Sequence, residues 1–326
     1  MKKRTKIAIS IISGFLGVFF IAAMIYYFGA SHKVFDSIST KALEIPGLET
    51  KFVPQGMEYD QPSNKVFVTG YMSNGEASRI YIINNETKKT EKYFTLTHEG
   101  ETYLGHCGGI AIYDTNVWIS GDGYLYRFEL AQALSVENGK SIEVLDKLKT
   151  RNGADFLFDY DNKLIVGEFY KKGKYDTPEN HHIQTSSGET NYALAFIYTI
   201  NTYKSYGLES TTPEAGISLP NQVQGMCFNA DGKIVLSTSY SLPNSLIYIH
   251  DNILNSSPSA TTTINNNELQ VYVLNKDNLV RTIEAPCMSE EIVLIDGKVC
   301  VLFENNCKKY KFFTRTRLKH IYALDI

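Results

Sequence analysis

The stretch VQGMCFNADGKIVLSTSY at residues 223–240 has the pattern of a β-hairpin. A short apolar run turns at Asn-Ala-Asp-Gly, and a second run resumes at a lysine with β-branched and apolar residues. Four more stretches follow the same order, and they begin at Pro54, Cys107, Gly153 and Ser289. Because a repeat with a period of tens of residues decides a whole architecture, these five copies predict a repeat fold.

Further strand-like runs follow each copy. A third strand is expected after every hairpin, starting at Ser78, Tyr124, Leu194, Ser245 and His320. A fourth is expected after the first four copies, as KTEKYFTL from Lys89, SIEVLDKL from Ser141, KSYGLES from Lys204 and NLVRTIEAP from Asn278. Four antiparallel strands per unit make one blade of a β-propeller. The sequence therefore predicts an all-β fold with five blades.

The fifth copy ends at its third strand, at the C-terminus. STKALEIPG from Ser39 is the candidate for the missing outer strand, and it would close the ring without leaving an open sheet edge. Two intervals, which begin at Tyr170 and Asn252, are longer than the others. Both are polar, so we expect surface loops there, with a sixth blade as the alternative.

The first thirty residues differ from the rest of the chain. Lys2, Lys3, Arg4 and Lys6 precede an uncharged run over residues 7–30, which is long enough to span a bilayer. We expect an uncleaved transmembrane anchor at 1–30 and a propeller at 31–326, with a cleaved signal peptide as the alternative. The positive-inside rule then places the N-terminus in the cytoplasm and the propeller outside the plasma membrane.

The composition is that of a globular protein, with 326 residues, 43% hydrophobic content and a net charge of −3. It has no basic excess, so we expect no nucleic acid partner. The five cysteines have no CxxC or Cys/His metal spacing. We expect buried free thiols, and a single disulfide is the alternative because the exported side permits one.

Residues that begin the inner strands of a propeller gather at one mouth of its channel, and those that end the second strands lie there too. Candidates for catalysis are Glu290, Glu291, His106 and Asp155. Candidates for ligand binding are Gln55, Tyr71, Asp122, Glu168, Gln224 and Tyr240, and Glu304 ends the last second strand. Such carboxylates and amides suit Ca²⁺, a cationic ligand or acid–base chemistry. The alternatives are a polar channel mouth without a function and a His106 that only holds a neighbouring loop.

One repeat position carries glycine in three copies, at Gly56, Gly109 and Gly225. We expect crowding of the inner strands around the axis to exclude a side chain there. In our alignment the third and fifth copies have Asp155 and Glu291 at this position. Carboxylates at a position otherwise given to glycine point to function.

The segments PQGMEYD, TGYMSNGEASRIYIIN and GGIAIY resemble the five-bladed glutamine cyclotransferase propellers. That family has a glutamate that serves the cyclisation before the glycine of its second-blade GEGI motif, and the matching residue here is Gly108. The QG and GG starts also resemble, more distantly, regucalcin-like, strictosidine synthase-like and paraoxonase-like propellers, many of them Ca²⁺-dependent. PQGxxY and GHxGGxA are similar to membrane-anchored propellers of Gram-positive bacteria.

Two classes of function follow. The first is a membrane-tethered module that binds a peptide, a glycan or a small molecule at the channel mouth. The second is an extracytoplasmic enzyme, a hydrolase, lactonase or glutamine cyclotransferase-like protein, with Ca²⁺ as its only expected cofactor. No GxSxG, HExxH or phosphate-loop motif is present to decide between them.

Overall fold

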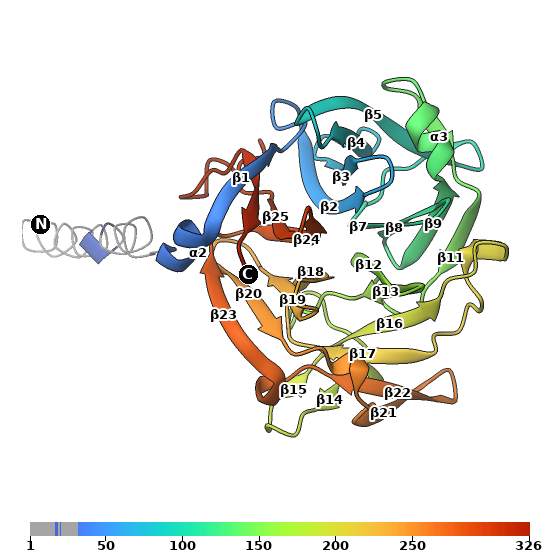
Figure 1. Ribbon diagram of the computed structural model, residues 1–326, viewed down its shortest axis with the longest axis vertical. Helices are drawn as coiled ribbons and strands as arrows, with labels where there is room; N and C mark the ends of the chain where they lie inside the picture. Colours follow the sequence, from blue (N-terminus) through green and yellow to red (C-terminus); the bar gives the residue numbers. More distant parts are fainter. Residues whose placement is uncertain (1–16, 19, 21–31) are drawn as a thin grey trace, which may run out of the picture.

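The computed structural model describes residues 17, 18, 20 and 32–326. Figure 1 shows five twisted sheets arranged as a ring around a central channel. The innermost strands β2, β7, β12, β18 and β24 contact one another in a closed circle. The five-bladed β-propeller predicted from the repeat is thus confirmed.

Each blade is built on four antiparallel strands, which in blades 1 to 4 follow chain order from the axis outward. Blade 1 contains β2 (Phe52–Asp60), β3 (Lys65–Met72), β4 (Arg79–Asn84) and β5 (Lys89–His98). Blade 2 contains β7 (Gly109–Tyr113), β8 (Asn116–Gly121), β9 (Tyr124–Glu129) and β11 (Asp146–Lys149). Blade 3 contains β12 (Phe156–Tyr160), β13 (Lys163–Gly167), β16 (Ala193–Thr199) and β17 (Ala215–Leu219). Blade 4 contains β18 (Val223–Phe228), β19 (Ile234–Thr238), β20 (Ser245–His250) and β23 (Leu279–Ala285).

Blade 5 is closed by the N-terminal strand, as the sequence predicts. Its strands are β24 (Ser289–Ile295), β25 (Lys298–Phe303), β26 (His320–Leu324) and β1 (Ser39–Glu44). The short helix α2 (Lys33–Ile38) leads into β1 and places Phe35 against Phe303, with ring centroids 5.9 Å apart. Both ends of the described chain are therefore held in one sheet.

Two outer strands differ from the prediction. The run from Ser141 divides between blades: β10 (Ser141–Glu143) pairs in parallel with β5, and only β11 belongs to blade 2. The run from Lys204 is not a strand but contains the 3₁₀ turn η2 (Ser205–Gly207), and β17 takes the outer position of blade 3. Lys204–Ser210 lacks the apolar alternation that a blade edge requires, whereas β17 is buried along most of its length.

The two long intervals contain more regular structure than expected. The segment after Asn252 forms the hairpin β21 (Ala260–Ile264) and β22 (Asn267–Val273), and β22 pairs in parallel with β17 to widen blade 3. The segment after Tyr170 carries η1 (Glu179–His181) and the small hairpin β14 (Ile183–Gln184) and β15 (Thr190–Asn191). Remaining elements are β6 (Glu101–Thr102), α3 (Leu130–Ser135), η3 (Ile253–Asn255) and η4 (Lys276–Asn278).

The glycines of the inner strands are explained by crowding. A Cβ at Gly109 would lie 2.3 Å from the backbone nitrogen of Leu157, and one at Gly225 would lie 2.0 Å from Glu291 Oε1. At Gly56 it would lie 2.4 Å from Thr69 Oγ1. Glycine at these sites therefore allows the blades to approach the axis.

The five cysteines are free and buried, as expected. The predicted anchor over residues 7–30 lies almost wholly outside the described residues. Within the part of the chain that the structure describes, no helix has the length and apolar character needed to cross a bilayer.

Candidate functional site

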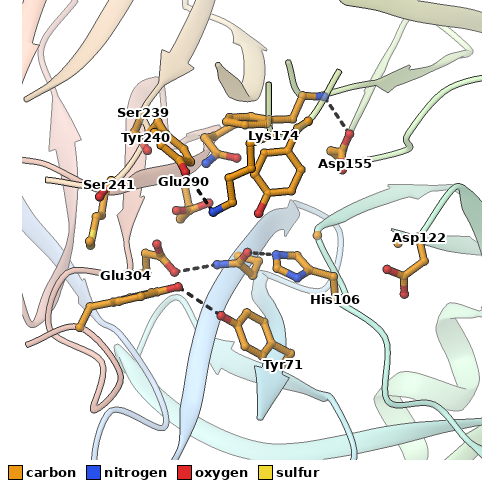
Figure 2. A pocket seen from close by; sticks show the side chains of 18 of the residues that line it. Tyr71, His106, Asp122, Asp155, Lys174, Ser239, Tyr240, Ser241, Glu290 and Glu304 are labelled. Carbon is orange, nitrogen blue, oxygen red and sulfur yellow. Dashed lines mark hydrogen bonds between the residues drawn. The ribbon is translucent and has the colours of Figure 1, made fainter. Parts of the chain in front are cut away.

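A cavity of about 630 Å³ opens at the mouth of the central channel, where the inner strands begin (Figure 2). Every blade contributes to its lining. Its floor carries carboxyl and amide side chains, and tyrosines and a lysine form its wall.

The strand register explains the lining as two rings of five equivalent positions. The first ring lies just before the crowded position of each inner strand and consists of Gln55, Gly108, Asp155, Gln224 and Glu290. The second ring lies at or just beyond the end of each second strand and consists of Tyr71, Asp122, Phe169, Ser239 and Glu304. All ten residues line the cavity, because equivalent positions in a radial repeat face the same axis.

Two of the predicted site residues, Glu291 and Glu168, do not line the cavity, and each is one position away from these rings. Side chains on a strand alternate between its faces, so a shift of one residue turns a side chain away from the cavity. Glu291 follows the first ring and lies buried between β18 and β24, where its Oε1 accepts hydrogen bonds from the backbone nitrogens of Met226 and Ile292. Glu168 precedes the second ring, is 2% exposed, and contacts His181 at 2.9 Å.

The alignment of the third copy also shifts. Phe156 pairs with Gly167 as Gly109 pairs with Ser120, so Phe156 and not Asp155 occupies the crowded position. Asp155 belongs to the first ring and lines the cavity. The repeat alignment is thus one residue out of register in the third copy, but Asp155 is still a residue of the cavity.

The most unusual feature of the cavity is a pair of neighbouring carboxyl groups from blade 5. Glu290 is 4% exposed and hydrogen-bonds to Glu304. Burial, followed by the charge of Glu304, raises the pKa of Glu290 well above its usual range. Burial raises the pKa of Glu304 to about 7. Two carboxyls this close cannot both ionise easily, so the pair holds a proton near neutral pH.

A chain of hydrogen bonds leads from this pair across to blade 2. Gln55 Nε2 donates to Glu304 Oε2 at 3.0 Å, and Gln55 Oε1 accepts a hydrogen bond from His106 Nε2. The amide orientation therefore assigns the proton of His106 to Nε2. The ring of His106 is exposed to water in the cavity. The protein atoms around it still hinder solvation of the charged form, and this lowers its pKa. A neutral imidazole thus stacks on Tyr71, with ring centroids 4.7 Å apart.

Asp155 and Asp122 add negative charge on the opposite side of the cavity. Asp155 Oδ2 accepts a hydrogen bond from the backbone nitrogen of Phe169 at 2.7 Å. Burial raises the pKa of Asp155 to about 6. The charges of nearby Glu168 and Asp122 contribute to this increase in pKa. The side chain is ionised at neutral pH, and it faces the channel mouth.

Residues in two long loops complete the wall, and they belong to no repeat position from which they could be predicted. Lys174 extends from the loop after blade 3's second strand and donates to the Tyr240 hydroxyl at 3.0 Å (Figure 2). Tyr310, in the loop between β25 and β26, lies 3.4 Å from the Tyr71 hydroxyl. Lys309 donates to the Tyr71 hydroxyl at 2.6 Å. Only the density of lysine and tyrosine in these loops could have indicated them.

Cys107 does not line the cavity. It is 1% exposed, and burial raises its pKa to about 12, so its thiol has neither the access nor the ionisation of a nucleophile. Among the described residues, no group of three or more His, Cys, Asp and Glu side chains is arranged to hold a metal ion. The Ca²⁺ site remains a prediction.

The comparisons with known proteins add a likeness of fold. No family model matches the chain, and no curated protein matches it. Among solved structures, the glutaminyl cyclase of Myxococcus xanthus is similar over 82% of this chain and 91% of its own, at 10% identity and a TM-score of 0.47.

Two further structures are similar over smaller shares. A Kuenenia stuttgartiensis hydrazine synthase covers 77% of this chain at 10% identity and a TM-score of 0.35. A Bacteroides caccae protein of unknown function covers 72% at 10% identity and a TM-score of 0.31. The chain spans 65% and 63% of their lengths, just under two thirds.

Proposed function

We propose that the cavity binds a small ligand that carries an amino group, with that group seated at the Glu290–Glu304 pair. The observation that supports this is the carboxyl pair, in which Glu290 is buried and Glu304 is half-buried, hydrogen-bonded to Gln55 and open to the cavity. An ammonium group beside the pair replaces a shared proton with a full positive charge, which allows a carboxyl to ionise. Charged hydrogen bonds of this kind are about twice as strong as neutral ones.

The rest of the lining supports the same ligand class. Asp155 and Asp122 increase the negative potential of the mouth. A volume of about 630 Å³ lies within the usual range for small-ligand pockets. A short peptide with a free N-terminus has the size and charge that this cavity accepts.

An enzyme of the acyl-transfer class is the second candidate, and one observation favours it. With its pKa at about 7, Glu304 exchanges a proton readily at neutral pH. In the cyclisation of an N-terminal glutamine, the α-amino nitrogen forms a bond to the side-chain amide carbon, and the C–N bond to the leaving ammonia breaks. One carboxylate of the pair would take the proton from the amine, and the other carboxyl would give one to the ammonia.

The position of the glutamate in the resembled family is closed here. A Cβ at Gly108 would lie 2.4 Å from the backbone oxygen of Asp155, so a glutamate does not fit at 108 without movement of the backbone. Gly108 and Glu290 occupy equivalent positions of the first ring. Acid–base chemistry in this chain would therefore use blade 5 in place of blade 2.

The test is a matched pair of ligands. We expect L-glutaminyl-L-phenylalanine amide to raise the unfolding temperature, because binding to the folded state stabilises it. The N-acetylated peptide, which has no ammonium group, should leave that temperature unchanged. Glu304→Gln should abolish the shift, whereas the control Glu268→Gln, at an exposed site on β22, should retain it. Equal shifts with both peptides would contradict the proposal.

Turnover is tested on the same peptide. Loss of ammonia, followed by mass spectrometry, would support the cyclase and should disappear in Glu290→Gln and Glu304→Gln. A bound peptide that keeps its mass would leave binding as the function and reject cyclisation. The membrane tether and the outside location belong to the proposal, and recovery of the full chain in the soluble fraction after cell lysis would contradict them.

A further inference from the structure

The loop between β25 and β26 has a surface unlike the rest of the chain. From Asn305 to Leu324 there is no Asp or Glu, while the chain as a whole has a net charge of −3. The six cationic residues of this loop are Lys308, Lys309, Lys311, Arg315, Arg317 and Lys319. We call residues 305–319 the basic loop.

Two aromatic rings lie on the surface of the basic loop. Phe312 is 72% exposed and Phe313 is 65% exposed, among the most exposed large apolar residues that the structure describes. Lys311 Nζ lies 5.4 Å from the centroid of the Phe312 ring. Exposing two neighbouring phenylalanine rings to water carries an unfavourable free energy of hydration. Aromatic residues surrounded by basic ones are typical of a segment that enters the headgroup region of a membrane.

The position of the loop relates it to the start of the described chain. Phe303, the last residue of β25, directly precedes the loop and packs against Phe35 of α2. Figure 1 shows α2 beside blade 5, and the lowered pKa of His32 has Arg315 among its causes. The basic loop is therefore on the side of the ring where the described chain begins, directly after the apolar run 7–30.

We propose that the basic loop docks on the headgroups of an anionic phospholipid bilayer, with Phe312 entering the interface. The opposite charges of the loop and the lipid supply the attraction, and the aromatic ring supplies the insertion. Tyr310 and Phe313 of the same loop line the cavity, so docking brings the channel mouth close to the lipid surface. The proposal does not depend on the ligand of the cavity.

The experiment uses the full chain and a probe at one site. All five native cysteines are buried, so Phe312→Cys accepts a fluorescent thiol label selectively. The labelled protein is mixed with vesicles of phosphatidylcholine containing brominated tails, with or without about 30% phosphatidylglycerol. We expect strong quenching only with the anionic lipid, and its loss at about 1 M salt, where screening is nearly complete. The matched control is Tyr203→Cys, at a residue 99% exposed in another blade, which should show little quenching.

Charge variants separate the loop from any other attachment. The double variant Lys311→Gln, Arg317→Gln should need about 25-fold more anionic lipid for half-maximal quenching at position 312, since each basic residue contributes about fivefold to membrane affinity. Lys298→Gln, an exposed lysine at the other end of β25, should not change it. Quenching at 312 that equals the control, or that persists in pure phosphatidylcholine, would overturn the proposal. Binding to a soluble polyanion without quenching by vesicles would also overturn it.

Discussion

Replacing Glu304 by glutamine should remove a pH dependence of stability that the carboxyl pair imposes. Burial raises the pKa of Glu304 from 4.5 to about 7. A carboxyl whose pKa is raised by folding stabilises the native state most fully below its unfolded pKa, and this contribution is lost as the pH rises through the folded pKa. The full loss is about 3 kcal/mol, since one pKa unit corresponds to about 1.4 kcal/mol.

Most of this loss falls between about pH 5 and pH 8. Glu304→Gln keeps the shape of the side chain and an oxygen that accepts from Gln55 Nε2, but it does not titrate. We therefore expect the wild-type free energy of unfolding to fall by about 2 kcal/mol more than that of the variant over this range.

Chemical denaturation at the two pH values, extrapolated to zero denaturant, measures the difference. Glu290 remains in the variant without the Glu304 charge that raises its pKa, so the comparison reports the titration of the coupled pair as a whole. Glu268→Gln, on the exposed hairpin of blade 3, serves as the control and should follow the wild type. A difference between wild type and Glu304→Gln that stays constant from pH 5 to pH 8 would refute the reasoning.

Three further predictions concern the fold. Gly225→Ala should lower the free energy of unfolding, measured by denaturant, by about 3 kcal/mol, because its Cβ would lie 2.8 Å from the Cα of Glu291. An unchanged free energy of unfolding would reject crowding at the axis. Phe35→Ala should cost about 4 kcal/mol, because Phe35 is 1% exposed and packs on Phe303 across the closing strand. An unchanged free energy of unfolding would show that closing blade 5 with the N-terminal strand contributes little to stability. The thiols, Cys107 among them, should resist alkylation until the protein unfolds, and rapid labelling of the native chain would contradict their burial.

The blade architecture could be predicted because each hairpin carries its own turn residues and alternation. The pairing of a strand at the edge of a blade depends on residues far away in the sequence, unlike the pairing within a hairpin. The run from Ser141 contains two short strands that pair with different blades, and sequence alone does not show which neighbour each one meets. The hairpin after Asn252 is polar because it covers an edge, so its composition resembles that of a loop.

The candidate site was predicted where the repeat fixes the register. Gln55, Gln224 and Glu290 occupy one equivalent position and reach the cavity. Glu291 and Glu168 are each one residue from the rings, and a bulge in the register before Ile292 could not be recognised from the letters. Loop residues such as Lys174 belong to no copy, so their arrival at the cavity depends on tertiary packing.

The most direct test of the central claim is the count of protons released when an amine enters the cavity. Titration calorimetry of L-glutaminyl-L-phenylalanine amide, in buffers of different ionisation enthalpy near pH 6, gives that number. The α-amino group is already cationic at that pH. If it displaces a proton from the Glu290–Glu304 pair, binding should release about one proton in the wild type and fewer in Glu304→Gln. Binding without proton release in the wild type would contradict the claim.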